Sequence, residues 1–305
     1  MSGAQAVAAR AAGQVRAGAV LALVFNAFAF GVSWWPFRQI GAMGLHPLWL
    51  TAIVYSIASL ALLALRPAAL GELLRTRSLW GLVLGAGITN ACFNWAVSIG
   101  DVVRVVLLFY LMPLWTVLLA RVLLGERISG RGALRVALAL AGALVVLWPA
   151  AGSTASAWPV PRNLAEALGV LGGIGFALNN VMLKRESHRS RSALALAMFA
   201  GGAVMALLLA VGFSQAGHAP WPPAPAIGWI AGAAGLAAWL LLANLALQRG
   251  ASALPANTTS VIMLTEVFFA SASALALGAG TLGPHEALGA LMILGAALLA
   301  SLQRD

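Results

Sequence analysis

Charged residues are scarce in this chain: Asp, Glu, Lys and Arg together make up 9% of its 305 residues. A soluble globular domain carries about 25% charged residues, so this sequence has too few to cover a water-facing surface. Hydrophobic residues account for 62% of the chain instead. The composition therefore indicates an integral membrane protein of the all-α class and argues against a soluble fold.

Cysteine and lysine are almost absent, with one residue of each. Cys92 cannot form a disulfide or a metal cluster by itself, so we expect a small buried hydrophobic side chain. Lys184 stands at the end of an apolar segment, which argues against a photoreceptor that holds its pigment on a lysine within the membrane. We expect no metal and no cofactor.

Enzyme motifs are also missing from the apolar segments. The chain has no His-Glu-x-x-His, no Gly-x-Ser-x-Gly and no Walker-type Gly-x-x-x-x-Gly-Lys sequence. No pair of carboxylates falls within the apolar segments, so acid and base roles could not be divided between two groups there. We therefore expect that the protein is not an enzyme.

Long apolar segments dominate what is present. A membrane-spanning helix needs about 20 apolar residues. The turns between the apolar segments are short and carry Pro, Gly or charge, which leaves no room for a soluble domain. The predicted spans are 17–37, 46–65, 79–99, 102–124, 132–150, 164–184, 192–213, 226–248, 254–278 and 286–302.

The last five spans echo the first five. A shift of 153 residues carries Gly125, Gly130 and Gly142 onto Gly278, Gly283 and Gly295. Because five is odd, the second copy must lie inverted in the bilayer. Inverted repeats around a site near the bilayer midplane are typical of secondary transporters. The sequence predicts a polytopic bundle of ten transmembrane helices, in which repeats of five helices, 1–150 and 151–305, surround a central cavity.

Basic residues are distributed very unequally between the two sides of this bundle. If the amino terminus is cytoplasmic, fifteen Lys and Arg residues lie on that side, and only Arg38, Arg104 and Arg162 lie on the other. Cytoplasmic loops of membrane proteins carry such an excess. We therefore expect both termini in the cytoplasm, and basic residues that meet anionic membrane lipid rather than nucleic acid.

Two residues are unusual for the middle of a span. Pro113 lies midway along the fourth span, and the 153-residue shift carries it onto Glu266, midway along the ninth. Proline removes a backbone hydrogen bond and kinks a helix, so Pro113 is a candidate gating residue. Glu266 could bind a substrate ammonium or carry a proton. It could also be a structural, hydrogen-bonded side chain.

Polar side chains recur within the spans and form our candidate substrate site. Asn90 and Asn94 lie one turn apart on the same face of the third span. Such amides can line a cavity and bind a polar, zwitterionic solute, or they can join neighbouring helices by hydrogen bonds. The predicted substrate-binding residues are Asn26, Phe30, Asn90, Asn94, Tyr110, Asn179, Trp239, Asn244, Thr258 and Glu266.

A charged pair opens the fourth span. Asp101 is a good N-cap for the helix that follows, and Arg104 stands at the spacing of an i, i+3 contact. The structural interpretation is a capped helix start. The functional interpretation is a charged gate at the outer mouth of the cavity.

The fourth span also carries a family resemblance. The segments Gly100-Asp101-Val102-Val103-Arg104 and Leu108-Phe109-Tyr110-Leu111-Met112-Pro113-Leu114-Trp115, and the end Leu124-Gly125-Glu126-Arg127, resemble the drug/metabolite transporter superfamily of EamA type. In the second repeat Ala279 replaces the glutamate at position 126.

The resemblance implies a central cavity lined by spans one, three, four, six, eight and nine. It also implies export of amino acids, aromatic ones among them, across a bacterial inner membrane by a monomer using alternating access. The same scaffold carries other metabolites and cationic drugs in related families, so these remain alternative substrates. A small-solute channel is a further alternative, although no ring of charges indicates one.

Overall fold

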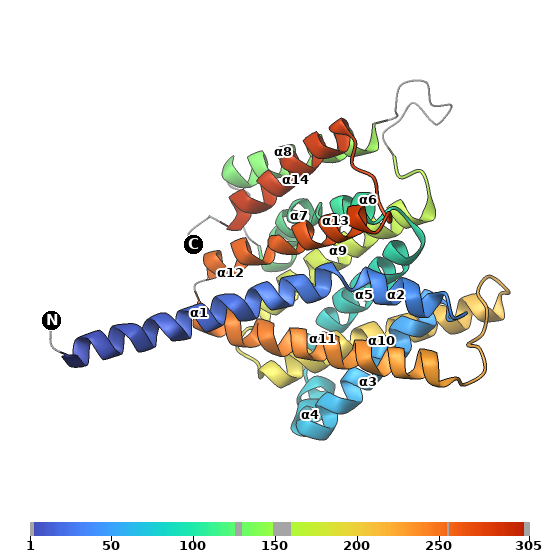
Figure 1. Cartoon of the computed structure of the whole chain (residues 1–305), viewed down its shortest axis with the longest axis horizontal. Helices are drawn as coiled ribbons and strands as arrows, with labels where there is room; N and C mark the ends of the chain where they lie inside the picture. The colour runs from blue at the N-terminus through green and yellow to red at the C-terminus, as the bar shows by residue number, and fades with distance from the viewer. Residues whose placement is uncertain (1–2, 126–129, 149–159, 255, 302–305) are drawn as a thin grey trace.

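The computed structural model describes residues 3–125, 130–148, 160–254 and 256–301. All regular secondary structure in these ranges is helical, and most helices run side by side along the long axis of the molecule (Figure 1). The helices are α1 (Gly3–Gly31), α2 (Trp34–Gly41), α3 (Pro47–Leu65), α4 (Ala68–Arg75), α5 (Leu79–Ile99), α6 (Val102–Phe109), α7 (Met112–Leu124), α8 (Gly130–Leu147), α9 (Leu164–Arg185), α10 (Arg191–Gln215), α11 (Ile227–Ala253), α12 (Ala256–Met263), α13 (Thr265–Ala276) and α14 (Pro284–Ser301).

The predicted spans correspond to helices of this bundle, which confirms the all-α polytopic fold. Seven helical segments of the described chain are long and apolar enough to cross a membrane, and three shorter apolar helices accompany them. The three shorter ones are Gly132–Leu147, Val261–Ala276 and Pro284–Leu299. Two features were not predicted: α1 begins at Gly3, well before residue 17, and the short helix α4 follows the second span.

Two spans are interrupted at equivalent positions of the proposed repeats. The fourth span breaks into α6 and α7 at Tyr110 and Leu111, and the ninth breaks into α12 and α13 at Leu264. The 153-residue shift carries Leu111 onto Leu264. Pro113 and Glu266 therefore both lie in the first turn of the helix that follows a break. Proline is tolerated in a first turn because its missing N–H would have no helical acceptor there.

Helix contacts follow a pattern expected of a two-fold relation. Helix α1 packs on α11, and α9, which occupies the same place in the second repeat, packs on α5. The second and seventh spans, α3 and α10, pack together, as do the fifth and tenth, α8 and α14 (Figure 1). This pattern is consistent with paired repeats. The boundary near residue 150 lies outside the described residues, so the division into repeats stays a prediction.

Glycines bring α9 close to its neighbours in the centre. A Cβ on Gly85 of α5 would lie 2.7 Å from the backbone nitrogen of Asn179. A Cβ on Gly173 of α9 would lie 2.6 Å from the carbonyl oxygen of Phe109, the last residue of α6. Small residues permit such approaches between membrane helices. They bring α5, α6 and α9 together around the middle of the bundle.

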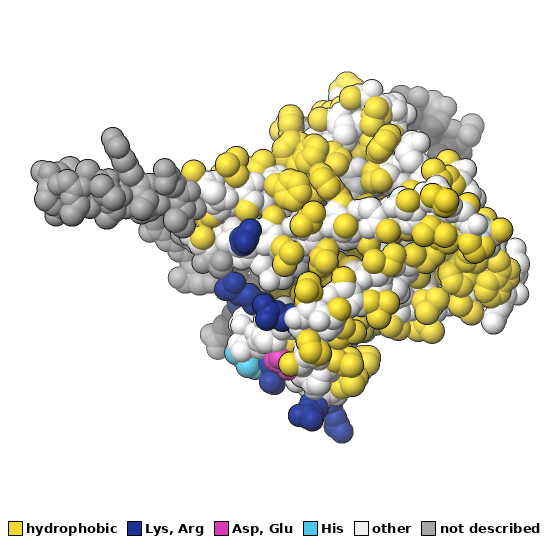
Figure 2. Space-filling view, turned by 60° about the horizontal axis from the view of Figure 1, so that its bottom comes forward, with side chains coloured by type: hydrophobic (Ala, Val, Ile, Leu, Met, Phe, Trp, Pro, Cys, Tyr) yellow, Lys and Arg dark blue, Asp and Glu magenta, His cyan; other side chains and the backbone are white. Residues whose placement is uncertain are grey.

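The surface drawn in Figure 2 is mainly apolar. Lys and Arg side chains on this face gather in the half of the molecule nearer the projecting amino-terminal helix (Figure 2). The broad apolar area suits a hydrocarbon environment, and the basic area suits lipid headgroups.

Candidate functional site

A central cavity of about 160 Å³ lies among the helices of both halves. Its lining comes from α1, α2, α3, α5, α6, α7, α9, α10, α11, α12 and α13, together with the turns at the helix breaks. Most of the residues that the sequence analysis singled out line it. These are Asn26, Phe30, Asn90, Asn94, Tyr110, Asn179, Asn244 and Glu266.

Two of the predicted substrate-binding residues do not line this cavity. Trp239 lies on a separate groove, and its indole N–H donates to the carbonyl oxygen of Ala29 at 3.2 Å. Thr258 is also absent from the cavity lining, whereas its neighbour Thr259 lines an adjoining cavity. Successive residues of a helix point about 100° apart, so a stretch of polar residues cannot all face one side.

The adjoining cavity of about 430 Å³ extends the central one toward the predicted cytoplasmic side. The two share Tyr110 and Glu266. The adjoining cavity then continues along Thr116 of α7, Asn180 of α9 and Thr259 of α12. Each of these residues lies in the half of its span that is nearer the predicted cytoplasmic end.

The amides of the third span both line the cavity and join helices. Asn90 Oδ1 accepts a hydrogen bond from the hydroxyl of Tyr55 on α3 at 2.6 Å, and Asn90 Nδ2 donates to the Ala86 carbonyl oxygen at 2.8 Å. Asn94 Nδ2 donates to Thr51 Oγ1, also on α3, at 3.3 Å. The two amides therefore line the cavity and also join α5 to α3, and their binding of a solute stays a prediction.

Asn26 of α1 is similarly anchored. Its Nδ2 donates to the Ala243 carbonyl oxygen of α11 at 2.7 Å, which fixes the side chain between these two helices. Its Oδ1 is buried and has no hydrogen-bond partner in the described structure. Asn179 Oδ1 on α9 is buried and unpartnered in the same way.

Glu266 is the only carboxylate on the cavity wall, and the described lining contains no Lys, Arg or His. Among the residues that the structure describes, its side chain has no hydrogen-bond or ion-pair partner. Gly31 lets α1 approach it closely, since a Cβ there would lie 2.8 Å from the Glu266 carbonyl oxygen. The interpretation of Glu266 as a hydrogen-bonded structural residue finds no partner in this part of the chain.

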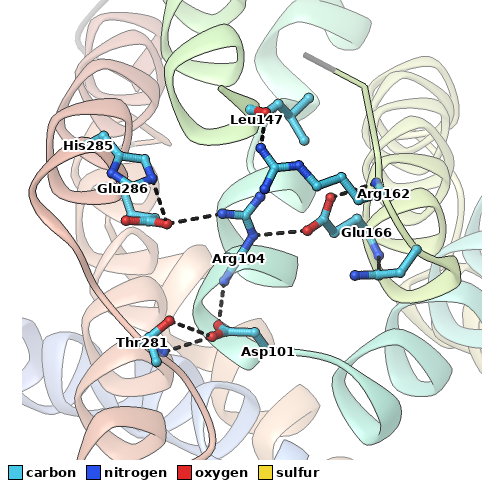
Figure 3. Close-up of polar contacts among 9 residues, drawn as sticks. Asp101, Arg104, Leu147, Arg162, Glu166, Thr281, His285 and Glu286 are labelled. Atoms are coloured by element: carbon cyan, nitrogen blue, oxygen red, sulfur yellow. Dashed lines mark hydrogen bonds and ion pairs between the residues drawn. The ribbon is translucent and has the colours of Figure 1, made fainter. Parts of the chain in front are cut away.

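The predicted outer ends of the spans are joined by an ion network, drawn in Figure 3. Arg104 Nε lies 3.0 Å from Glu166 Oε1, and one of its terminal nitrogens lies 3.0 Å from Glu286 Oε1. These carboxylates belong to the first turns of α9 and α14. His285 Nε2 lies 3.0 Å from Glu286. One guanidinium on α6 thus links three spans.

Backbone groups complete this outer network. Glu166 accepts from the backbone N–H of Arg162 at 2.9 Å, and the Arg162 side chain donates to the Leu147 carbonyl oxygen at 2.8 Å (Figure 3). Asp101 accepts from the backbone N–H and the hydroxyl of Thr281 at 2.8 and 3.1 Å. The network therefore also holds the end of α8 and the segment between α13 and α14.

The Asp101–Arg104 prediction is correct for the backbone and wrong for the side chains. Asp101 is the N-cap of α6 and accepts from the Arg104 backbone N–H at 3.0 Å. The expected side-chain pair does not form, because the Arg104 guanidinium points to Glu166 and Glu286 instead. Its Nε and one terminal nitrogen lie against carboxylates on other helices, and its other terminal nitrogen is buried with no partner among the described residues.

The comparison with known families falls on the first half of the chain. Residues 17–148 match the model of the EamA-like transporter family. The first five spans are therefore similar to a domain of this transporter family. The protein is accordingly a multi-pass membrane transporter.

A solved crystal structure is similar over nearly the whole of this chain. The similarity has a TM-score of 0.59 and 19% sequence identity, and it covers 94% of this chain and 97% of the other. At that identity the likeness shows the fold alone. No curated protein matches the sequence.

The sequence analysis did not predict the partners of Arg104. Glu166 and Glu286 stand at the outer starts of two spans that are far from Arg104 along the chain. A signal was present: the predicted outer side carries three acids, Asp101, Glu166 and Glu286, for its three arginines. On a side so poor in charge, equal numbers of opposite sign indicate pairing.

The sequence analysis also did not predict several aromatic and methionine side chains of the cavity wall. The rings of Phe93 and Phe109 lie 4.6 Å apart, and those of Phe109 and Phe176 lie 5.3 Å apart, measured between centroids. Met112, Met198 and Met263 line the cavity too. In a chain that is apolar throughout, such residues carry no signal that separates a cavity wall from a lipid-facing surface.

Proposed function

We propose that this protein is a secondary transporter that exports amino acids, aromatic and other neutral or polar ones, from the cytoplasm by alternating access. The observation that carries the proposal is the central cavity, whose amides, aromatic rings and single carboxylate could hold a zwitterion with an apolar side chain. We also propose that it acts as a monomer in the inner membrane of a bacterium, and that both termini are cytoplasmic, as the distribution of Lys and Arg predicts.

The two ends of the cavity differ in a way that supports alternating access. The adjoining cavity leads toward the predicted cytoplasmic side. The network around Arg104 ties α6, α9 and α14 together at the opposite end. We propose that this arrangement receives solute from the cytoplasm, and that release requires the Arg104 contacts to break. A permanently open channel would have no such seal.

The broken spans provide the moving parts in this proposal. The turn at Tyr110 and Leu111 separates α6 from α7. Helix α6 bears Arg104, whereas α7 bears Pro113 and borders the adjoining cavity. Because no helical hydrogen bond from the nitrogen of Pro113 can cross this turn, the two halves can tilt separately. Pro113 is therefore the proposed hinge residue, and Asp101 and Arg104 are the proposed outer-gate residues.

Proteoliposomes containing the purified protein test the proposal. Counterflow of radiolabelled phenylalanine is measured against a panel of unlabelled amino acids, with and without a pH gradient. We expect saturable counterflow, and we expect accelerated uptake under a pH gradient if Glu266 carries protons. Empty liposomes are the control. The absence of saturable counterflow for every amino acid tested would contradict the proposed function.

Cationic drugs are the second candidate substrates, and Glu266 is the observation that favours them. A single carboxylate without a basic counterpart on the described wall suits a positively charged solute. Sugar phosphates and nucleotides fit poorly, because an anion would meet that carboxylate and no positive side chain. Including a cationic dye in the same counterflow panel distinguishes the two candidates.

A further inference from the structure

Some residues that line the central cavity carry hydrogen-bond acceptors that lack donors. Asn26 Oδ1 and Asn179 Oδ1 are buried without partners, on side chains that are 0% and 2% exposed. The orientation of Asn26 is fixed, because its Nδ2 is committed to the Ala243 carbonyl oxygen. Glu266 adds a carboxylate that has no partner among the described residues. Unmet buried acceptors are unfavourable, so they favour a ligand that donates.

Most donors of the same wall are already used within the protein. The hydroxyl of Tyr55 donates to Asn90, that of Ser33 to the Phe30 carbonyl oxygen, and that of Thr89 to the Gly85 carbonyl oxygen. Asn90 Nδ2 and Asn94 Nδ2 donate to groups on the protein as well. The Tyr110 hydroxyl and the amide nitrogens of Asn179 and Asn244 donate to no described group, but no positively charged side chain lines the described wall. A solute carboxylate therefore meets only neutral donors, whereas a solute ammonium meets the charged Glu266.

The remainder of the wall suits an apolar body. Phe93, Phe109 and Phe176 form a continuous aromatic group on one part of it, and Phe30 and Phe199 line it elsewhere. Aromatic faces attract a cation as well as apolar groups. An ammonium group near Glu266 with an attached ring or alkyl chain would satisfy both the acceptors and the apolar surface.

We infer that this cavity recognises the ammonium group of its solute through Glu266, Asn26 and Asn179 and needs no carboxylate, so that the protein also binds apolar primary amines. This inference rests on the proposed function for the direction of transport only. The binding chemistry follows from the cavity itself. Apolar primary amines are the decarboxylated counterparts of the amino acids that the proposed function names.

Direct binding to the purified protein tests this inference without relying on transport. Isothermal titration measures four related compounds: phenethylamine, phenylalanine amide, N-acetylphenylalanine and 3-phenylpropionate. The first two carry the ammonium without a carboxylate, and the last two carry the carboxylate without an ammonium. We expect the two amines to bind at least as tightly as phenylalanine, and the two acids to bind at least about tenfold more weakly.

Variants locate the binding to the cavity. Glu266→Gln keeps the shape of the side chain and removes its charge, and it should weaken phenethylamine binding by about tenfold or more. Glu72→Gln is the matched control, because Glu72 lies on α4 outside the cavity and bonds to Ser190 there. It should leave the affinity unchanged. If Glu266→Gln does not fold, the four-compound series on the native chain still shows whether binding requires the ammonium group or the carboxylate.

The outcomes separate this inference from the proposed function. Tight binding of the acids with no binding of the amines would overturn the inference, and so would a failure of both amines to bind. Equal amine binding by Glu266→Gln and the native chain would also overturn it. Amine binding in a protein that shows no amino-acid counterflow would contradict the proposed function and leave the inference standing.

Discussion

A single residue, Arg104, joins helices from both halves of the chain at the predicted outer end of the bundle. The Arg104 side chain is 12% exposed, and it is the only side chain shown to bridge both Glu166 and Glu286. Neither acid lies on its own helix. Removing one partner of a buried ion pair leaves an uncompensated charge, which costs more than the pair itself contributes.

Arg104→Met should therefore destabilise the protein strongly. We expect a loss of about 3–5 kcal/mol in the free energy of unfolding, because two carboxylates would face each other without the guanidinium. Denaturant melts in detergent measure it. Arg185→Met is the control, since Arg185 is half-exposed and its partner Glu186 also pairs with Arg189, so the carboxylate keeps a positive neighbour and we expect a loss of about 0–1 kcal/mol. Equal losses in both variants would contradict the outer-gate assignment.

The two amides of the third span should separate binding from stability. Asn90→Ala leaves the buried Tyr55 hydroxyl without its acceptor, so we expect about 1–3 kcal/mol of destabilisation. Asn94→Ala removes only a long contact to Thr51, so its stability loss should stay near about 0.6 kcal/mol. We expect Asn94→Ala to raise the half-saturation concentration for substrate instead. Thermal melts and counterflow distinguish these effects, and the reverse order would contradict the assignment.

At the scale of helices, the interruptions and the close contacts work together. The breaks in the fourth and ninth spans lie at equivalent positions and place Tyr110 and Glu266 on the cavity wall. The break near Pro113 follows from the sequence, because proline has no N–H to donate to the Phe109 carbonyl oxygen. That this carbonyl then lies against Gly173 of α9 follows only from packing.

Pro113→Ala supplies a backbone N–H that can donate to the Phe109 carbonyl oxygen. A continuous helix could then form across the break between α6 and α7. We expect the fold to survive and transport to slow, because α6 and α7 could then tilt less independently. Initial rates of counterflow at matched protein content measure the change. Unchanged rates would remove Pro113 from the gating residues.

Gly173→Ala tests the contact between α6 and α9. Its new Cβ would lie 2.6 Å from the Phe109 carbonyl oxygen, so the helices must separate, and we expect a loss of about 1–3 kcal/mol. Gly235→Ala is the matched control, because nothing lies within 4 Å of a Cβ there. That control should be neutral or slightly stabilising, since alanine favours a helix. Thermal stability in detergent compares the two variants.

For the whole molecule, orientation in the membrane is the property with the widest consequences. The adjoining cavity is an entry for cytoplasmic solute only if the side that holds most of the Lys and Arg residues faces the cytoplasm. The fifteen-to-three distribution of Lys and Arg predicts that orientation.

Single cysteines test the orientation in a Cys92→Ala background. Ser187→Cys, between α9 and α10, should be protected in intact cells from a membrane-impermeant thiol reagent. His218→Cys, between α10 and α11, should be labelled from outside. Permeabilised cells provide the control, in which both positions should react. Labelling of the Ser187 position from outside would reverse the proposed direction of transport.

The amino-acid sequence by itself determined the class of the protein, the number of spans and the position of the break near Pro113. It could do so because apolar length and the missing proline N–H are local properties that need no tertiary contact. It also indicated Glu266 and most of the amides on the cavity wall, because polar groups in hydrocarbon are expensive wherever they occur.

Only the tertiary structure decided which way those groups face and which of them remain without partners. Trp239 and Thr258 were indistinguishable in sequence from cavity residues, and packing placed both elsewhere. Arg104 found its carboxylates on α9 and α14 rather than on its own helix. Pairing between distant spans depends on how the helices pack, and in a chain whose apolar residues are alike on every face, helix packing leaves little local signal.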